Sequence, residues 1–207
     1  MKLAIDLDDV VLDTTKAIID VLKDKHNIYI DANDIDVYDI GESTGLDHEL
    51  ISLVVNEAIN SEYIEPIFGA VPTINWLGNY LKPIYFLTNR YDYKSTLEQI
   101  QYLEFDIEYE IHLCKKTNNG VPNKAKLIND LGINTVIEDR VETIMDIYKR
   151  TNADIVVFDK PWNKCVEEND RIFRVKSWII DIVYYFMNHG LKNGGINGLA
   201  RSSNRNR

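Results

Sequence analysis

Several features that mark particular protein classes are scarce in this chain of 207 residues. Its two cysteines, Cys114 and Cys165, are too few for a disulfide framework and lack the paired spacing of a zinc or redox site. No apolar run is long enough to cross a membrane, and Asp6 interrupts the N-terminus too early for a signal peptide. These absences predict a cytoplasmic protein without a membrane segment.

Basic residues are also scarce. The chain has 23 Lys and Arg against 33 Asp and Glu, which gives a formal net charge of −10. Four of the basic residues and none of the acidic ones lie in 188–207, so residues 1–187 carry a charge of −14. A body this acidic is not expected to bind nucleic acid, whose backbone requires a supply of Lys and Arg. The segment 188–207 is rich in Gly, Asn, Ser and Arg, and is predicted to be a disordered tail.

The rest of the chain alternates short apolar runs with amphipathic segments. This rhythm predicts an α/β fold, in which a mostly parallel sheet lies between two layers of helices. The predicted strands cover about 3–5, 84–87, 111–114, 135–137 and 155–158. Helices are expected from Thr14 or Thr15 as the capping residue, and over about 47–59, 73–81, 97–103, 123–131, 141–150 and 177–187.

Two carboxylates follow the first predicted strand. Ligands of parallel sheets bind beyond the carboxyl ends of the strands, where Asp6 and Asp8 would lie. Because the two residues are two apart in extended chain, their side chains project to the same side. One could then act as a nucleophile and the other as a proton donor or acceptor. Acids after a strand are also commonly no more than solvated charges, so the pair alone leaves both interpretations open.

Groups suited to phosphate follow the next strand and open a later helix. The Thr88 hydroxyl and the Asn89 amide stand at a strand-to-helix junction, where they could form an anion nest or a simple helix cap. Lys124 begins a helix on the side of its apolar face, whereas Lys126 points elsewhere. We therefore favour Lys124 as a phosphate-binding cation, with Lys126 as its rival and a solvated surface charge as the alternative for either.

The fourth predicted strand ends in Glu138 and Asp139, hard oxygen ligands of the kind that hold Mg²⁺. In this order, the four groups resemble the motifs of the haloacid dehalogenase (HAD) superfamily of aspartate-nucleophile phosphatases. Residues 3–11 look like its first motif, Thr88 its second, Lys124 its third, and Glu138 with Asp139 its fourth. Glu138 stands where Asp is commoner in that family. The resemblance covers nearly all of residues 1–160.

This resemblance implies a catalytic scheme. Asp6 would attack phosphorus to form an aspartyl-phosphate, and Asp8 would act as general acid and base. Mg²⁺ would be the cofactor, held by Asp6, the Asp8 carbonyl, Asp139 and Glu138. The phosphate itself would be bound by Thr88, the Asn89 amide and Lys124.

The resemblance also implies a domain arrangement. A Rossmann-like three-layer α/β/α HAD core would comprise 1–13 and 73–187, and residues 14–72 would form a small helical cap of the C1 type. Residues 6–12 and 157–163 are similar to segments of the 5′(3′)-deoxyribonucleotidase group, the cytosolic type C nucleotidases. A simple turn is the alternative for Pro161-Trp162-Asn163. The implied substrate is a nucleoside monophosphate, and a homodimer is the expected assembly.

Cap aromatics are the natural candidates for contacts with a nucleobase. Tyr38, Tyr63 and Phe68 are available, although each could instead belong to the cap core. Arg90 follows Thr88 and could contact the nucleotide or pair with an acid. Three other functions stay open: a phosphatase for a sugar phosphate, one for a polynucleotide 3′ end, which the charge of −14 disfavours, and a phosphate-binding protein without turnover.

Overall fold

The computed structural model describes residues 1–60, 63–115 and 123–190. From residue 191 onward, the predicted tail lies outside these ranges.

The centre of the molecule is one parallel sheet. In the described ranges it has six strands in the order β3-β2-β1-β4-β5-β6, and every pair of neighbours is parallel. This confirms the predicted α/β class. The strand β6 was not predicted, because its four residues between charged neighbours carry no pattern of their own. The strands are β1 (Leu3–Ile5), β2 (Ile84–Thr88), β3 (Tyr109–Leu113), β4 (Thr135–Glu138), β5 (Asp154–Phe158) and β6 (Ile172–Val175).

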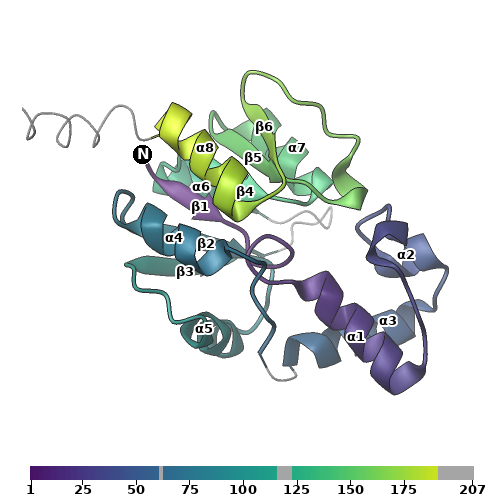
Figure 1. Cartoon of the computed structure of the whole chain (residues 1–207). Helices are drawn as coiled ribbons and strands as arrows, with labels where there is room; N and C mark the ends of the chain where they lie inside the picture. The colour runs from purple at the N-terminus through teal and green to yellow at the C-terminus, as the bar shows by residue number, and fades with distance from the viewer. Residues whose placement is uncertain (61–62, 116–122, 191–207) are drawn as a thin grey trace, which may run out of the picture.

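Helices cover both faces of the sheet (Figure 1). On one face, α4 (Ala70–Gly78), α5 (Tyr93–Tyr102) and α8 (Val183–Tyr185) pack against alternate residues of the strands. On the other face lie α6 (Lys124–Leu131) and α7 (Val141–Arg150). Because side chains alternate along a strand, β1 sends Leu3 and Ile5 into the first layer and Ala4 into the second. The three-layer prediction is confirmed.

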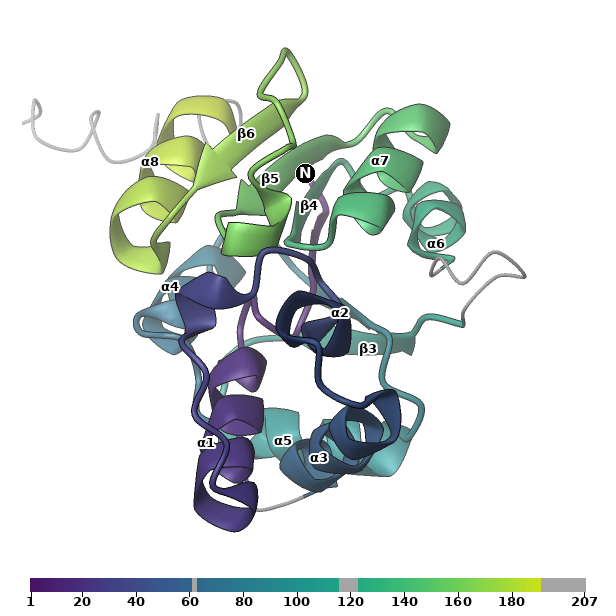
Figure 2. The same cartoon turned by 90° about the vertical axis from the view of Figure 1, so that its right-hand side faces the viewer.

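Three further helices form a separate group, called the cap from here on, after β1 (Figure 2). They are α1 (Thr14–His26), α2 (Ile40–Thr44) and α3 (His48–Asn60), with a short 3₁₀ turn at Ala32–Asp34. They share a hydrophobic cluster that is distinct from the two clusters of the sheet. Ile64 and Ala70, which fall in the predicted cap range of 14–72, pack instead in a cluster of the sheet.

Several helix boundaries differ from the prediction. Neither Thr14 nor Thr15 is the capping residue of α1, because both lie in its first turn and Asp13 precedes them. Helix α4 begins at Ala70 instead of 73, since Pro72 is tolerated in a first turn. The predicted helix 177–187 consists of π-helical turns at Trp178–Ile182 and Phe186–Gly190 on either side of α8. Among the described helices, none combines the length and apolar character needed to cross a bilayer.

Candidate functional site

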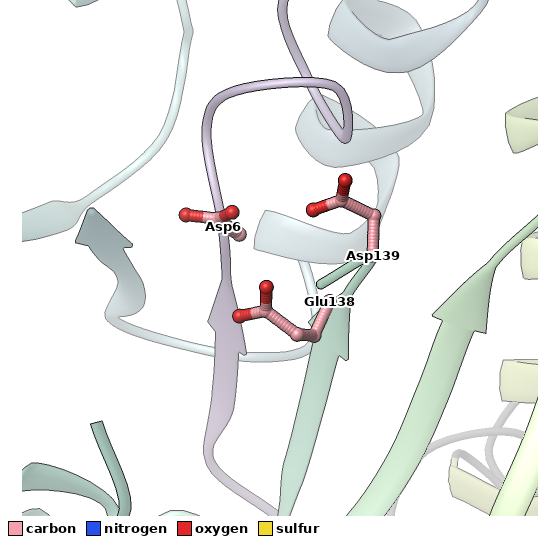
Figure 3. Close-up of side chains that lie close together, drawn as sticks. All are labelled: Asp6, Glu138 and Asp139. Carbon is pink, nitrogen blue, oxygen red and sulfur yellow. The ribbon is translucent and has the colours of Figure 1, made fainter. Parts of the chain in front are cut away.

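The site is built where β1 and β4 end side by side. The backbone N–H of Asp6 donates to the carbonyl of Ile137 at 3.0 Å, which continues the β1–β4 pairing by one residue. Asp6 therefore lies beside the end of β4, where Glu138 is the last strand residue and Asp139 follows it. Figure 3 shows the three carboxylates facing one space. Each offers an oxygen within 4.8 Å of the others, and all three residues are buried.

Lys124 is a buried cation that faces two of these acids. Lys124 opens α6, and its Nζ lies 2.7 Å from Asp6 Oδ1 and 2.7 Å from Glu138 Oε2. Only 1% of the Lys124 residue surface is exposed, and the two carboxylates raise the pKa of its ammonium although burial alone would lower it. Lys126, the rival, is exposed and pairs with Asp130 on the same helix. The geometry thus brings Lys124, and not Lys126, to Asp6.

The three carboxylates of Asp6, Glu138 and Asp139 carry more negative charge than Lys124 can balance. Burial raises the pKa of Asp6 to about 8, against the opposing attraction of Lys124. Burial, then the charges of Glu138 and Asp6, raise the pKa of Asp139 well above its usual range. Asp139 Oδ1 is buried and has no hydrogen-bond partner among the described residues. Unpaired oxygen, excess negative charge and an all-carboxylate donor set are what a hard divalent cation requires.

Asp8 faces a different environment from Asp6. Arg90 donates to its carboxylate from Nη2 at 2.7 Å and from Nε at 3.2 Å, and the Thr14 hydroxyl donates at 2.7 Å. Burial alone would raise the pKa of Asp8, yet the Arg90 guanidinium holds it below its ordinary value. Arg90 is itself buried. Of the two interpretations given for Arg90, the structure has it paired with an acid, and that acid is the candidate proton donor.

The end of β2 completes the group. Thr88 is fully buried, and its hydroxyl accepts the backbone N–H of Arg90 at 3.2 Å. Asn89 is half-buried, and its side-chain oxygen has no partner among the described residues. Thr88 is the last residue of β2 and Asn89 follows it, so both lie at the carboxyl edge of the sheet. The neighbouring strand is β1, which Asp6 follows.

The three aromatic residues predicted to contact a nucleobase lie in different environments. Tyr38 lies beside the site: its ring is 4.5 Å from the Arg140 guanidinium and meets the Trp162 ring edge-on, with 39% of the residue exposed. Tyr63 instead stacks on Tyr102 at the last turn of α5, with ring centroids 4.2 Å apart. Phe68 is 86% exposed. Among the described residues, no contact joins Tyr63 or Phe68 to the acidic group.

Two further residues that contact the acidic group or the turn before α1 are not among the predicted site residues. Asp9 has a left-handed backbone, with φ of 59°, and accepts the backbone N–H and hydroxyl of Thr15 at the start of α1. Trp162, in the 3₁₀ turn Pro161–Asn163, donates its indole N–H to Asp139 Oδ2 at 3.0 Å. The family-like segment 157–163 was the available signal for Trp162, but it does not indicate the contact with Asp139.

Sequence comparisons find no matching family model and no matching curated protein. Solved structures do match. A hydrolase from Pseudomonas syringae has 17% identity and a TM-score of 0.54, over 91% of this chain and 98% of its own. The candidate HAD hydrolase YfnB from Bacillus subtilis, bound to magnesium, has 13% identity and a TM-score of 0.53, over 90% and 98%.

A third match is a structure described as a candidate phosphoglycolate phosphatase from Lactobacillus delbrueckii subsp. bulgaricus. It has 12% identity and a TM-score of 0.53, over 86% of this chain and 94% of its own. At identities this low the likeness concerns architecture. The chain has the fold of HAD hydrolases, with a buried acidic group at the position where its first and fourth strands end.

Proposed function

We propose that this protein is a magnesium-dependent phosphomonoester hydrolase in which Asp6 is the nucleophile. One observation carries the proposal: in a HAD-type fold, Asp6 faces Lys124, Glu138 and Asp139 at one buried point. A non-catalytic phosphate-binding protein would not need a buried carboxylate beside a cation and a further pair of acids. Such burial is costly, and it is typical of functional sites.

The residues present fit Mg²⁺. Asp6, Glu138 and Asp139 would hold it with the Asp8 carbonyl, and the unpaired Oδ1 of Asp139 would gain a partner. When bound, the ion would offset the charge that spreads over the phosphoryl oxygens.

The chemistry assigned to this chain has two steps. In the first, an Asp6 oxygen forms a bond to phosphorus while the bond to the ester oxygen breaks, and that oxygen takes a proton from Asp8. In the second, water attacks phosphorus, gives a proton to Asp8 and releases Asp6. Arg90 keeps Asp8 ionised in the described arrangement, which suits the second step. Substrate binding that loosened this ion pair would suit the first step.

Phosphate would be held by Thr88, the Asn89 amide and Lys124. We extend the proposal to nucleoside monophosphates as substrates, in the manner of the 5′(3′)-deoxyribonucleotidases. The support is the resemblance of 6–12 and 157–163, and the packing of the Tyr38 ring against Arg140 and Trp162. Tyr63 and Phe68 add no support, because within ranges 1–60, 63–115 and 123–190 neither has a contact with the acidic group.

A second candidate substrate class is a small carboxylate or sugar phosphate. It is favoured by the similarity to the structure described as a candidate phosphoglycolate phosphatase. The two classes differ in the leaving group, so one assay separates them.

The test is phosphate release from a panel of deoxy- and ribonucleoside monophosphates, sugar phosphates and phosphoglycolate, with Mg²⁺ or with EDTA. We expect turnover that requires Mg²⁺ and is fastest on nucleotides. Asp6→Asn should lower kcat by about 10³-fold or more, because it removes the attacking oxygen. Asp24→Asn, on the exposed side of α1, is the matched control. Turnover preserved in Asp6→Asn, or absent from the wild type on every ester, would overturn the proposal, whereas preference for non-nucleotides would overturn only the substrate class.

A further inference from the structure

Trp162 lies between the acidic group and the cap. Its indole N–H donates to Asp139 Oδ2, and only 7% of the residue is exposed. Tryptophan nitrogen is a donor only, so this bond has one direction. Asp139 therefore has one oxygen engaged by the indole, and the other, Oδ1, is buried without a partner among the described residues.

The ring of Trp162 is held from the cap side. Trp162 belongs to the hydrophobic cluster that α1 and α3 form, with members such as Ile18 and Val54. The Tyr38 ring meets it edge-on, with centroids 6.2 Å apart and planes at 82°. A ring packed in this way cannot turn its N–H away from Asp139 without disturbing the cap.

The backbone beneath Trp162 is held from the sheet side. The side-chain amide of Asn163 donates from Nδ2 to the carbonyl of Asp139 at 2.8 Å and to that of Phe158 at 2.9 Å. Arg174, on β6, donates to Asn163 Oδ1 at 2.7 Å and to Asp159 at 2.8 Å. The turn Pro161–Asn163 is thus tied both to β6 and to the residue whose side chain Trp162 contacts.

We infer that Trp162 is a positioning residue: its indole N–H occupies Oδ2 of Asp139, so that Oδ1 is the oxygen presented to a divalent cation, and its packed ring makes that orientation depend on the docked cap. The inference rests on the proposed metal-dependent function. Hydrogen-bond partners of metal ligands typically contribute 10- to 100-fold to metal affinity.

The first test is Mg²⁺ binding by calorimetry to purified protein without substrate. Trp162→Phe keeps an aromatic ring in the cap cluster and removes the N–H. We expect its Kd for Mg²⁺ to rise about 10- to 100-fold. Trp76→Phe is the matched control, because Trp76 packs at the edge of the sheet cluster and contacts Tyr80. Its Mg²⁺ affinity should be unchanged.

The second test needs no variant at position 162. In ¹⁵N-labelled wild-type protein, the indole N–H signals of Trp76 and Trp178 are assigned from their Phe variants, and the third signal is Trp162. Titration with Mg²⁺ should shift the Trp162 signal and leave that of Trp76 in place.

The outcomes separate the two proposals. Wild-type protein that binds no Mg²⁺ would overturn the proposed function and this inference with it. Mg²⁺ binding with equal affinity in Trp162→Phe, or with an unmoved Trp162 signal, would overturn this inference alone.

Discussion

At the scale of single residues, Lys124 supplies positive charge that stabilises the buried acidic group when no metal ion is bound. It is almost completely buried and lies 2.7 Å from oxygens of both Asp6 and Glu138. A buried ion pair adds little folding stability compared with apolar residues of similar volume. Removing one partner, however, leaves a buried charge that has neither water nor a counterion. The side chain therefore stabilises the site mainly by preventing that condition.

We predict that Lys124→Met lowers the free energy of unfolding by about 3–5 kcal/mol in EDTA. Lys126→Met is the control, because it lies on the same helix but pairs with Asp130 at the surface. Surface pairs contribute about 1 kcal/mol or less, so its effect should be small. Urea unfolding of both variants measures the difference. Equal losses would contradict the placement of Lys124 among the acids.

Asp9 shows how one residue ties the site to the cap. Its positive φ turns the chain after Asp8, and its carboxylate accepts from Thr15 at the first turn of α1. Orphan backbone donors at a helix start are usually satisfied by the residue just before the helix. Here the acceptor comes from six residues upstream of Thr15. The turn that places Asp6 and Asp8 thus also orients the first cap helix.

At the scale of elements, the cap is joined to the sheet by two chain segments that run side by side. Asp13 N–H donates to the carbonyl of Glu65, and Ile67 N–H donates to that of Val11. Beside them, the buried Gln99 of α5 both donates to and accepts from the backbone of Ile64, at 3.0 and 2.9 Å. These bonds fix the direction in which the cap leaves the sheet.

Gly69 marks a close approach between the start of α4 and the C-terminal helical segment. Its φ is +84°, and a Cβ there would lie 2.5 Å from a side-chain carbon of Ile179. We predict that Gly69→Ala lowers the free energy of unfolding by about 2–5 kcal/mol, from left-handed strain and overpacking together.

Gly45→Ala is the control for backbone strain alone, since its φ is +69° and nothing lies within 4 Å of an added Cβ. Gly45→Ala should lower the free energy of unfolding by about 1–2 kcal/mol. Comparing the two by urea unfolding isolates the effect of packing. A Gly69→Ala variant no less stable than Gly45→Ala would contradict the packing of α4 against this segment.

At the scale of the whole molecule, the two cysteines report on the fold. Cys114 is buried just beyond β3, and burial raises the pKa of its thiol to about 12, whereas Cys165 is exposed. Because the thiolate is the reactive form, Cys114 should resist alkylation at pH 8. Mass spectrometry should detect one iodoacetamide adduct on the folded protein and two in urea. The Cys165→Ser variant should give none when folded, and an adduct on native Cys114 would contradict the fold around β3.

Most of the architecture could be predicted from local patterns. Apolar runs alternating with amphipathic segments indicated an α/β sheet with helices on both faces, because burial on two faces requires continuous apolar strands. The same reasoning indicated that Asp6, Asp8, Glu138 and Asp139 follow strand ends. In contrast, the sequence does not predict β6, and it predicts Thr14 or Thr15 as the cap of α1 where Asp13 stands, because four-residue strands and exact helix starts leave little trace in sequence.

What the sequence by itself determined is therefore the order of elements and the acids at their ends. The tertiary structure decided which partners those acids have. Arg90 binds Asp8, which is 82 residues earlier in the chain, and Trp162 binds Asp139, which is 23 residues earlier. Tyr63 instead stacks on Tyr102. Periodicity gives the face on which a side chain lies within its own element. Contacts between elements depend on how helices and strands pack against one another, so only the folded chain determines them.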